Sequence, residues 1–493
     1  MKSRNYAGIS LLASLAACNS ATAETVQKNS TQAPQKPNVI VILADDLGYG
    51  DLKCYGAKNV ETPHVDKLAS EGIRFTNAHT VAATSTPSRY SLLTGEYAWR
   101  RPDTDIAAGD VKMIIRPEQY TMADMFKSTG YATGAIGKWH LGLGDKAGTQ
   151  DWNAPLPCAL GDLGFDYHYI MAATADRVPC VYIENGKVAN YDPSAPIEVS
   201  YQRNFEGEPT GKSNPEMLYN LKPSHGHDMS IVNGISRIGF MKGGGKALWK
   251  DENIADSLTT HAIQFIEENK DKPFFLYFSP TIPHADLDIM GEAMTEYEGE
   301  FCETPFGGSR DGYKSQQNPR AAYAAMVTYL DKTVGLIIKD LKEKGLYDHT
   351  IIVFTSDNGV HSEGGHDPSY FDSNGPFRGQ KRDLYEGGIR TPFVIQWPGV
   401  IPQGVVTNHI SAFWDFLPTI GELVQADIPQ NIDGISYLPT LTGKGTQKEH
   451  DCIYYEFFEF GGKQSIMTPD GWKLVRLEVS DPSKTYEELY NIY

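Results

Sequence analysis

The stretch Asn38-Val39-Ile40-Val41-Ile42-Leu43-Ala44-Asp45-Asp46 decides the fold of this 493-residue chain. Its continuous β-branched run is typical of a strand buried on both faces of a parallel sheet. In open α/β sheets, ligands bind outside the carboxyl ends of such strands. A turn would account for one aspartate at this point, but two in succession suit a hard divalent cation, which takes several oxygen ligands. We therefore expect Asp45 and Asp46 to bind a metal ion.

Three more apolar runs, at residues 131–136, 273–278 and 350–355, predict further buried strands. The polar residues that follow them are Lys138 and His140, then His284, then Asp357 with Asn358. A lone lysine is usually a surface charge and a lone histidine is usually structural, but placement at a strand end favours a ligand site. The aspartates and Asn358 form an oxygen-only set, which fits Ca²⁺ better than Zn²⁺.

The stretch Thr84-Ser85-Thr86-Pro87-Ser88-Arg89-Tyr90-Ser91-Leu92-Leu93-Thr94-Gly95 predicts an extended segment that turns into a helix. Pro87 suits a first helical turn, and Gly95 can end the helix. Ser85 would then lie at the helix N-terminus with Arg89 one turn further on. Backbone N–H groups, the helix dipole and a guanidinium together favour an oxyanion there. The simpler interpretation is that Ser85 or Ser88 only caps the helix.

Three segments resemble signatures of the formylglycine-dependent (type I) sulfatases. They are Ser-x-Pro-Ser-Arg followed by Leu-Leu-Thr-Gly at residues 85–95, Gly-Lys-Trp-His-x-Gly at 137–142, and Tyr-Glu-Gly-Gly-x-Arg-x-Pro at 385–392. The resemblance continues in family order over nearly the whole chain from Pro37. It implies an alkaline-phosphatase-like α/β fold, with a mixed, mostly parallel sheet sandwiched by helices and a small C-terminal antiparallel-sheet subdomain.

The family mechanism implied by this resemblance depends on one modified residue. Ser85 is oxidised to formylglycine (3-oxoalanine), and a hydroxyl of the hydrated aldehyde attacks the sulfur of a sulfate ester. A radical maturation enzyme of anaerobic bacteria carries out this conversion in serine-type members of the family. The second hydroxyl lets the sulfated intermediate expel sulfate, which an ordinary serine ester could not do.

The resemblance also implies a ligand set. The Ca²⁺ ligands are Asp45, Asp46, the converted Ser85, Asp357 and Asn358. Arg89 and calcium polarise the hydrated aldehyde, and His140 is the base in the collapse of the sulfated intermediate.

The remaining implied roles concern the sulfate group and the leaving group. Lys138, His284 and Lys381 bind the sulfate, and His284 protonates the departing alcohol with help from Lys381. Without the family context, Lys381, Arg382 and Arg390 would be interpreted as a solvated basic face.

Three functions fit these residues. The leading one is an exported sulfatase that acts on O-sulfate of a carbohydrate, such as a glycosaminoglycan or a mucin-type glycan. The second is a phosphodiesterase or phosphonate hydrolase of the same superfamily, which would prefer phosphoesters to sulfates. The third is a non-catalytic protein that binds sulfated glycans and in which Ser85 is never converted.

The charge of the chain bears on its partners. A net charge of −18 argues against nucleic acid as a partner. It does not exclude an anionic substrate. At physiological salt, charges more than about 8 Å from a site are largely screened, so nearby Arg, Lys and metal determine whether an anion binds. A hydrophobic content of 40% and a charged content of 22% are those of an ordinary globular protein.

The N-terminus predicts export. Lys2 and Arg4 precede an apolar run at residues 6–17 that is too short to span a bilayer. Residues 15–18, Leu-Ala-Ala-Cys, resemble a bacterial lipobox, which would leave Cys18 lipidated, whereas Ala-Thr-Ala at 21–23 fits ordinary signal cleavage. We favour the lipoprotein, located in the periplasm or anchored to the outer membrane of a bacterium.

These observations divide the chain into an export signal (1–18), a flexible tether (19–36), a catalytic domain (37–445) and a smaller C-terminal subdomain (446–493). The last of these stops before the closing segment that the family usually has. Residues 145–250 show no clear period and predict a long insertion over the sheet. The cysteines beyond Cys18 are odd in number, and one disulfide, with Cys158 and Cys180 as candidates, is compatible with an exported protein.

Overall fold

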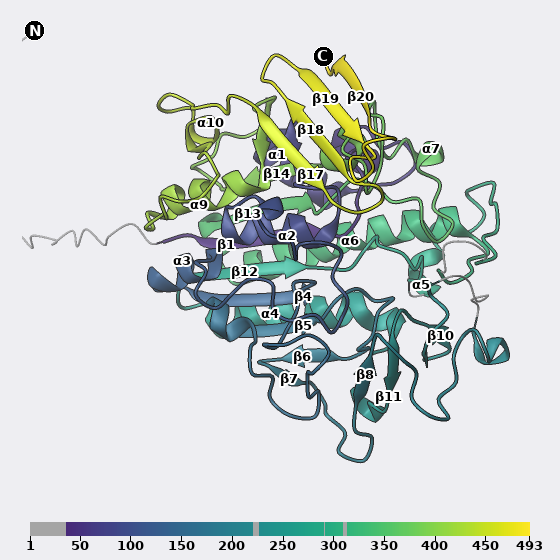
Figure 1. Cartoon of the computed structure of the whole chain (residues 1–493). Coiled ribbons are helices and arrows are strands. Elements are labelled where there is room, and N and C mark those ends of the chain that lie inside the picture. The colour runs from purple at the N-terminus through teal and green to yellow at the C-terminus, as the bar shows by residue number, and fades with distance from the viewer. Residues whose placement is uncertain (1–35, 220–225, 290, 309–312) are drawn as a thin grey trace, which may run out of the picture. The chain divides into compact units, whose positions relative to one another are not determined.

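The fold is built on one mixed sheet, shown in the computed structural model of Figure 1, which describes residues 36–219, 226–289, 291–308 and 313–493. The predicted export signal, Cys18 and nearly all of the tether lie outside these residues. The sheet has ten strands in the order β15-β2-β14-β13-β1-β12-β4-β5-β6-β7. Their bounds are β1 Asn38–Ala44, β2 Ile73–Phe75, β4 Ala132–Lys138, β5 Tyr167–Met171, β6 Tyr182–Glu184, β7 Lys187–Val188, β12 Phe274–Ser279, β13 Thr350–Ser356, β14 Phe393–Gln396 and β15 Val405–Thr407.

The centre of the sheet confirms the predicted buried parallel strands. Strands β13, β1, β12, β4 and β5 run parallel to one another, and β14 and β6 pair with this group in the antiparallel direction. Every residue of β1, β4, β12 and β13 is buried. Continuous apolar runs follow from this burial, because both faces of each strand are covered.

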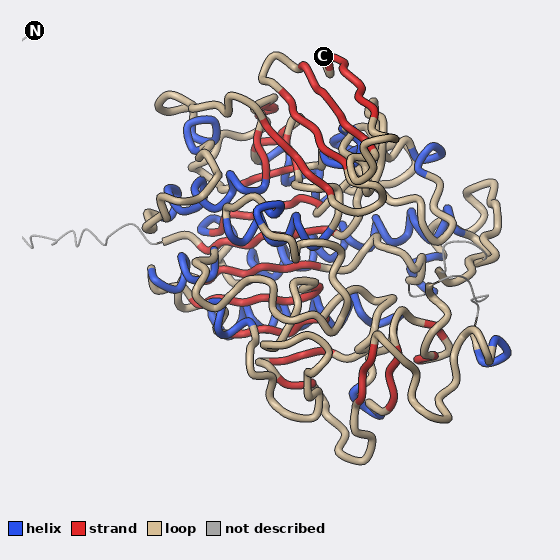
Figure 2. The backbone as a smooth tube through the Cα atoms, in the orientation of Figure 1, coloured by secondary structure: helices blue, strands red, loops and turns tan. Residues whose placement is uncertain are grey.

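Helices cover both faces of the sheet. Adjacent strand residues point to opposite faces. Phe274 of β12 meets Phe265 of α4 (Ile254–Asn269), while Phe275 meets Phe126 of α3 (Met122–Ser128). Figure 2 shows helices on either side of the strands. The main helices are α1 Pro63–Glu71, α2 Ser85–Thr94, α3 Met122–Ser128, α4 Ile254–Asn269, α6 Pro319–Glu343 and α9 Phe416–Val424; the shorter ones are α5 Gly291–Met294, α7 Pro368–Phe371, α8 Glu386–Ile389 and α10 Leu438–Thr442.

Helix α6 is buried in the core of the protein for most of its length. Among the described residues, it alone is long and apolar enough to cross a membrane, but 83% of its most apolar segment is buried within the protein. It packs against α1, α4 and α5.

The prediction of residues 145–250 as an insertion over the sheet is wrong in part. Strand β5 from this region joins the parallel sheet beside β4, and β6 and β7 extend the same edge. Strands of two to five residues are too short for a hydrophobic period to be read from sequence. The described part of the region also contains two small antiparallel pairs, β8 Glu198–Ser200 with β11 Phe240–Lys242 and β9 Ile231–Val232 with β10 Ile235–Ser236.

The expected C-terminal antiparallel sheet is present. It consists of β17 Ile453–Phe457, β18 Lys463–Met467, β19 Trp472–Leu477 and β20 Tyr486–Asn491, paired in chain order. A separate subdomain from residue 446 stays a prediction. The candidate disulfide does not form: Cys158 and Cys180 are free, as are the other described cysteines.

A buried ion cluster joins this sheet to the rest of the protein. Lys473 of β19 is fully buried and its Nζ donates to Glu386 Oε1 of α8 at 2.6 Å. Glu386 Oε2 also accepts from Arg390 Nε at 2.6 Å and lies 3.0 Å from His79 Nε2, in the short strand β3 Ala78–His79, which pairs with β16 Ser411–Ala412. Burial opposes ionisation of Glu386, but Lys473, His79 and Arg390 hold its pKa well below the ordinary value.

We predict that Lys473→Met lowers the free energy of unfolding by about 3 kcal/mol, because breaking a buried pair leaves part of a charge uncompensated. Lys484→Met is the control, because Lys484 is 69% exposed and its pair with Asp481 is a surface pair. Urea unfolding of both variants measures the difference. Equal stability of the two would contradict a structural role for the buried cluster.

Candidate active site

Polar residues from the carboxyl ends of the central strands meet at one edge of the sheet. The register pairs Ala44 at the end of β1 with Ser356 at the end of β13. The residues that follow, Asp45 and Asp357, are therefore neighbours, and Lys138 at the end of β4 joins them. All three side chains are buried.

Ser85 lies at the beginning of α2 among these charges. The N-cap of the helix is Thr84, so the interpretation of Ser85 or Ser88 as the cap is wrong. Ser85 Oγ accepts a hydrogen bond from Lys138 Nζ at 2.8 Å and donates to Asp45 Oδ1 at 3.4 Å. Lys138 Nζ also donates to Asp45 Oδ1 at 2.6 Å. The hydroxyl predicted for conversion is thus held between a cation and a carboxylate.

Arg89, one turn along α2, neutralises a second carboxylate. Its Nη2 and Nε donate to Asp357 Oδ2 at 2.6 and 3.2 Å. Its Nη1 donates to the carbonyl of Lys138 at 3.1 Å and to Ser279 Oγ at the end of β12. Burial opposes ionisation of Asp357, but Arg89 and then Lys138 keep its pKa below the ordinary value. Arg89 therefore ties α2 to three of the central strands.

Lys381 and His284 form the other half of the cluster. Lys381 Nζ donates to Asp46 Oδ2 at 2.7 Å and to Glu363 Oε2 at 2.9 Å, and lies 3.4 Å from His284 Nε2. His284 Nδ1 contacts the carbonyl of Ala285, which requires its proton on Nδ1 and leaves Nε2 with a lone pair. Burial and then Lys381 lower the pKa of His284 to about 4.

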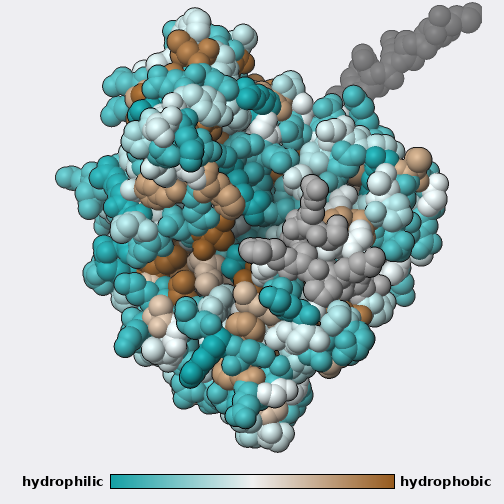
Figure 3. All heavy atoms as spheres, turned by 45° about the vertical axis from the view of Figure 1, so that its right-hand side comes forward, coloured by the Kyte–Doolittle hydropathy of each residue, from teal (hydrophilic) through white to brown (hydrophobic). Residues whose placement is uncertain are grey.

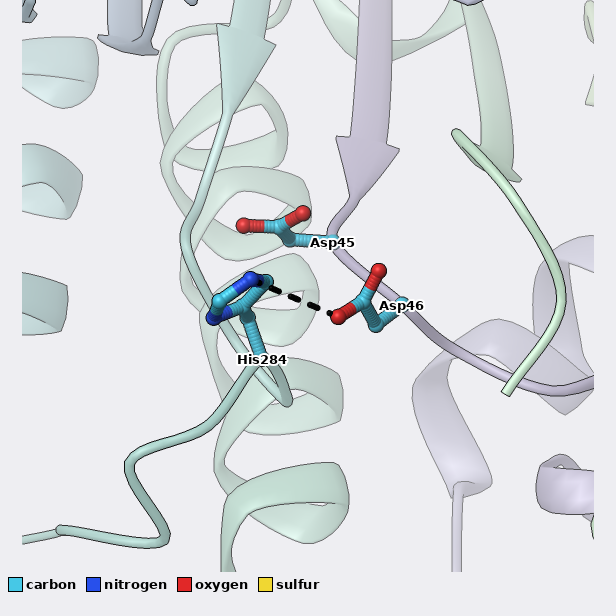
Figure 4. Close-up of side chains that lie close together, drawn as sticks. All are labelled: Asp45, Asp46 and His284. Carbon is cyan, nitrogen blue, oxygen red and sulfur yellow. Dashed lines mark ion pairs between the residues drawn. The ribbon is translucent and has the colours of Figure 1, made fainter. Parts of the chain in front are cut away.

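The aspartate cluster has the properties of a cation site. Figure 4 shows Asp45, Asp46 and His284 side by side, and a ligand atom of each lies within 4.8 Å of the others. Asp45 Oδ2 and Asn358 Oδ1 are buried without a hydrogen-bond partner among the described residues. Burial raises the pKa of Asp45 to about 8, with Asp357 and Asp46 adding to the effect of burial and Lys138 opposing it. A hard cation would satisfy the two free oxygens and offset the repulsion between carboxylates.

The other predicted ligands contact the same group. Asn358 Nδ2 donates to Asp46 Oδ1 at 2.7 Å, and the backbone N–H of Asp46 donates to Asp357 Oδ1 at 3.1 Å. His284, which was predicted to bind sulfate, lies next to the carboxylates of Asp45 and Asp46. Asp45, Asp46, Asp357 and Asn358 therefore fit a metal ion, and His284 lies beside them.

His140 is held as a neutral imidazole. Its Nε2 lies 2.9 Å from the carbonyl of Ala107 and so donates its proton there, while Nδ1 has no partner among the described residues. Burial and then the charge of Lys138 lower its pKa well below the ordinary value. Its Nδ1 is therefore free to accept a proton.

A small pocket opens onto Ser85. Of the predicted residues, Ser85, His140, His284 and Lys381 line it, so the structure brings together the residues that the sequence placed at separate strand ends. Figure 3 brings forward the side toward which β12 points, and shows a hollowed surface with hydrophobic residues beside it.

Other residues of this pocket were not singled out from sequence. Asp176 is 4% exposed, and its Oδ1 has no partner in the described part of the chain. Arg177 and Tyr313 line the same pocket, and Tyr313 donates to Glu363 Oε2 at 3.1 Å. Asp176 and Arg177 lie in the region without a clear period, and Glu363 lies in a loop, so no sequence pattern marks them.

The chain is similar to known proteins over most of its length. Residues 37–426 match the sulfatase family, and residues 376–490 match the C-terminal region of N-sulphoglucosamine sulphohydrolase. The chain belongs to the sulfatase family, whose fold its mixed sheet shares, and it is a sulfuric ester hydrolase.

Individual relatives agree with this assignment. An N-acetylgalactosamine-6-O-sulfatase of Bacteroides thetaiotaomicron is 43% identical over 454 residues, which cover 89% of this chain and 82% of that protein. A solved structure from work on the metabolism of multiple glycosaminoglycans by the same species has a TM-score of 0.82 at 38% identity and covers 93% of each chain. The phosphonate monoester hydrolase of Agrobacterium radiobacter shares the fold, with a TM-score of 0.59 at 19% identity over 93% of this chain and 89% of the hydrolase.

We predict that Arg89→Lys lowers the free energy of unfolding by about 2 kcal/mol and reduces sulfate release at least about tenfold, because one ammonium cannot replace the guanidinium contacts to Asp357, Ser279 and Lys138. Arg476→Lys is the control, since Arg476 is 45% exposed and pairs with Glu487 at the surface. Chemical unfolding and sulfate release are measured for both. An Arg89 variant as stable and active as the control would show that the buried guanidinium is not required.

Proposed function

We propose that this sulfatase hydrolyses O-sulfate esters on a carbohydrate of the glycosaminoglycan or mucin type. The observation that carries the proposal is Ser85, which lies 2.8 Å from Lys138 in a pocket lined by cations and imidazoles. The 43% identical relative is an N-acetylgalactosamine-6-O-sulfatase. A 6-O-sulfated N-acetylgalactosamine is therefore the first substrate to test.

The nucleophile in this proposal is formylglycine made from Ser85 by a serine-type maturation enzyme. When formed and hydrated, it supplies a hydroxyl that attacks sulfur and a second hydroxyl that later expels sulfate. The position of Ser85 supports this role, because Lys138 and the N-terminus of α2 stabilise negative charge at its side-chain oxygen.

Two lysines of the chain stabilise the transferring sulfate, and an arginine holds one of them in place. Lys138 and Lys381 bind its oxygens, and Arg89 holds Lys138 and Asp357 in place. Because these groups are buried and already fixed by hydrogen bonds, they need little rearrangement as charge develops.

Two histidines move protons in this proposal. His284 Nε2 takes a proton from Lys381 Nζ, 3.4 Å away, and passes it to the oxygen of the leaving alcohol as the S–O bond breaks, so the proton lost by Lys381 ends on the alcohol. His140 is neutral with a free Nδ1, which suits the base that takes a proton when the sulfated intermediate collapses.

The metal in this proposal is Ca²⁺, held by Asp45, Asp46, Asp357, Asn358 and the converted Ser85. Bound there, it supplies Lewis-acid polarisation of the reacting oxygen. The all-oxygen protein ligands and the two unpartnered buried oxygens support calcium over a softer metal.

Asp176 and Arg177 are the candidates for recognition of the sugar. Burial opposes ionisation of Asp176, but Arg177 and then the nearby histidines His227 and His284 lower its pKa to about 2, so it is a carboxylate. Its free Oδ1 can accept a hydrogen bond from a sugar hydroxyl, and Arg177 can donate to a neighbouring one.

For the location, we propose export to the periplasm or the outer membrane of a bacterium, with a lipid on Cys18. The support is the N-terminal sequence alone.

The first test produces the protein with a serine-type maturation enzyme and measures the peptide mass at Ser85 together with sulfate release from a panel of sulfated sugars. We expect the mass of an aldehyde at Ser85 and release from 6-O-sulfated N-acetylgalactosamine. Ser85→Ala should lower release at least about a thousandfold, as loss of a covalent nucleophile does. Ser88→Ala is the matched control, because Ser88 is also buried in α2.

Two results would contradict the proposal. Conversion of Ser85 with strong preference for phosphonate or phosphate esters would favour the phosphonate hydrolase class. A sulfated glycan bound without conversion or turnover would favour a binding protein.

We also predict that Ca²⁺ stabilises the metal-stripped protein, by about 2.7 kcal/mol at a free concentration one hundred times the dissociation constant. Asp45→Asn should remove most of this effect, since it removes a ligand charge. The control is Asp372→Asn, because Asp372 is an exposed aspartate that pairs with Lys58 at the surface. The measurement is thermal unfolding of each protein with and without Ca²⁺. If Ca²⁺ stabilises Asp45→Asn as much as wild type, the ion binds elsewhere.

A further inference from the structure

A loop of the C-terminal sheet reaches the rim of the Ser85 pocket. It comprises residues 458–462 between β17 and β18, and its Glu459 Oε1 accepts a hydrogen bond from the backbone N–H of Ile106 at 2.9 Å. Just after the loop, Lys463 Nζ donates to the carbonyl of Arg382 at 2.6 Å. Ile106 and Arg382 both line the pocket, so the loop is held against the pocket wall at two points.

Phe460 exposes its ring at this rim. Phe460 is 59% exposed, and the guanidinium of Arg382 lies 5.5 Å from its ring centroid. Behind it, Phe457 is buried and stacks on Phe460 at 6.1 Å between ring centroids. The ring of Phe460 is thus supported by two neighbours while more than half of its surface stays open.

The backbone of Phe460 is in an unfavourable conformation for this residue. Its φ is 51°, in the left-handed region that bulky side chains rarely adopt. An exposed phenylalanine gains little from burial, so folding gives no reason for a large aromatic side chain here. Strained residues of this kind cluster at ligand-binding sites.

We propose that Phe460 is a stacking platform for a pyranose ring of the substrate glycan, namely the sugar next to the sulfated one. This inference rests on the proposed carbohydrate substrate. The sulfated sugar must enter the pocket to bring sulfate to Ser85, so a ring bound at the rim belongs to its neighbour. The C–H face of a pyranose is apolar and packs against an aromatic ring, as aromatic side chains do in many binding pockets.

The test compares wild type and Phe460→Asn on a 6-O-sulfated monosaccharide and on a disaccharide that carries the same sulfated sugar. Asparagine tolerates the left-handed backbone, so the thermal midpoint should not fall. We expect KM for the disaccharide to rise about tenfold with little change in kcat, and KM for the monosaccharide to stay the same, because only the stacking contact is lost. Trp472→Ala is the control, since Trp472 is an exposed aromatic residue of β19 in the same sheet.

The outcomes separate this inference from the proposed function. Wild-type protein that releases no sulfate from either sugar contradicts the carbohydrate substrate itself. Wild-type turnover together with an unchanged disaccharide KM in Phe460→Asn overturns the platform. Equal rises in KM for both substrates overturn the assignment to the neighbouring sugar.

Discussion

The burial of several carboxylates next to lysines and an arginine, at one edge of the sheet, is the constraint on which the rest of the structure depends. Burying an isolated charge costs more free energy than the net stability of a folded domain. Each buried carboxylate therefore needs a partner of opposite charge. Lys138 pairs with Asp45, Arg89 with Asp357 and Lys381 with Asp46. These pairs fix the elements that carry them, which are the ends of the central strands, helix α2 and the loop around Lys381.

The same constraint prepares the site for chemistry. Pairing within the protein still leaves Asp45 Oδ2 and Asn358 Oδ1 without hydrogen bonds in the described structure. The site therefore holds fixed positive groups for an anion and free oxygens for a cation within one buried cluster. Ser85 lies where the two meet, which gives a physical reason why the proposed conversion falls on the first residue of α2 rather than elsewhere on that helix.

The sequence predicts those parts of the protein in which a hydrophobic pattern extends over six or so residues. Strands β1, β12 and β13 are continuous apolar runs, and their following polar residues converge because parallel strands end at one edge. Short strands such as β5 carry too few residues for a period, so their place in the sheet was missed. Asp176 and Glu363 enter the site through loop packing, which depends on contacts between distant segments and leaves no local signature.

We propose that the strand-end oxygens form one calcium site beside Ser85. The direct measurement is a crystal structure of the protein grown with Ca²⁺, with anomalous scattering recorded to locate calcium. We predict a single strong peak about 2.3–2.6 Å from oxygens of Asp45, Asp46, Asp357 and Asn358. A map with no peak among these residues, or with calcium bound only at the surface, would contradict it.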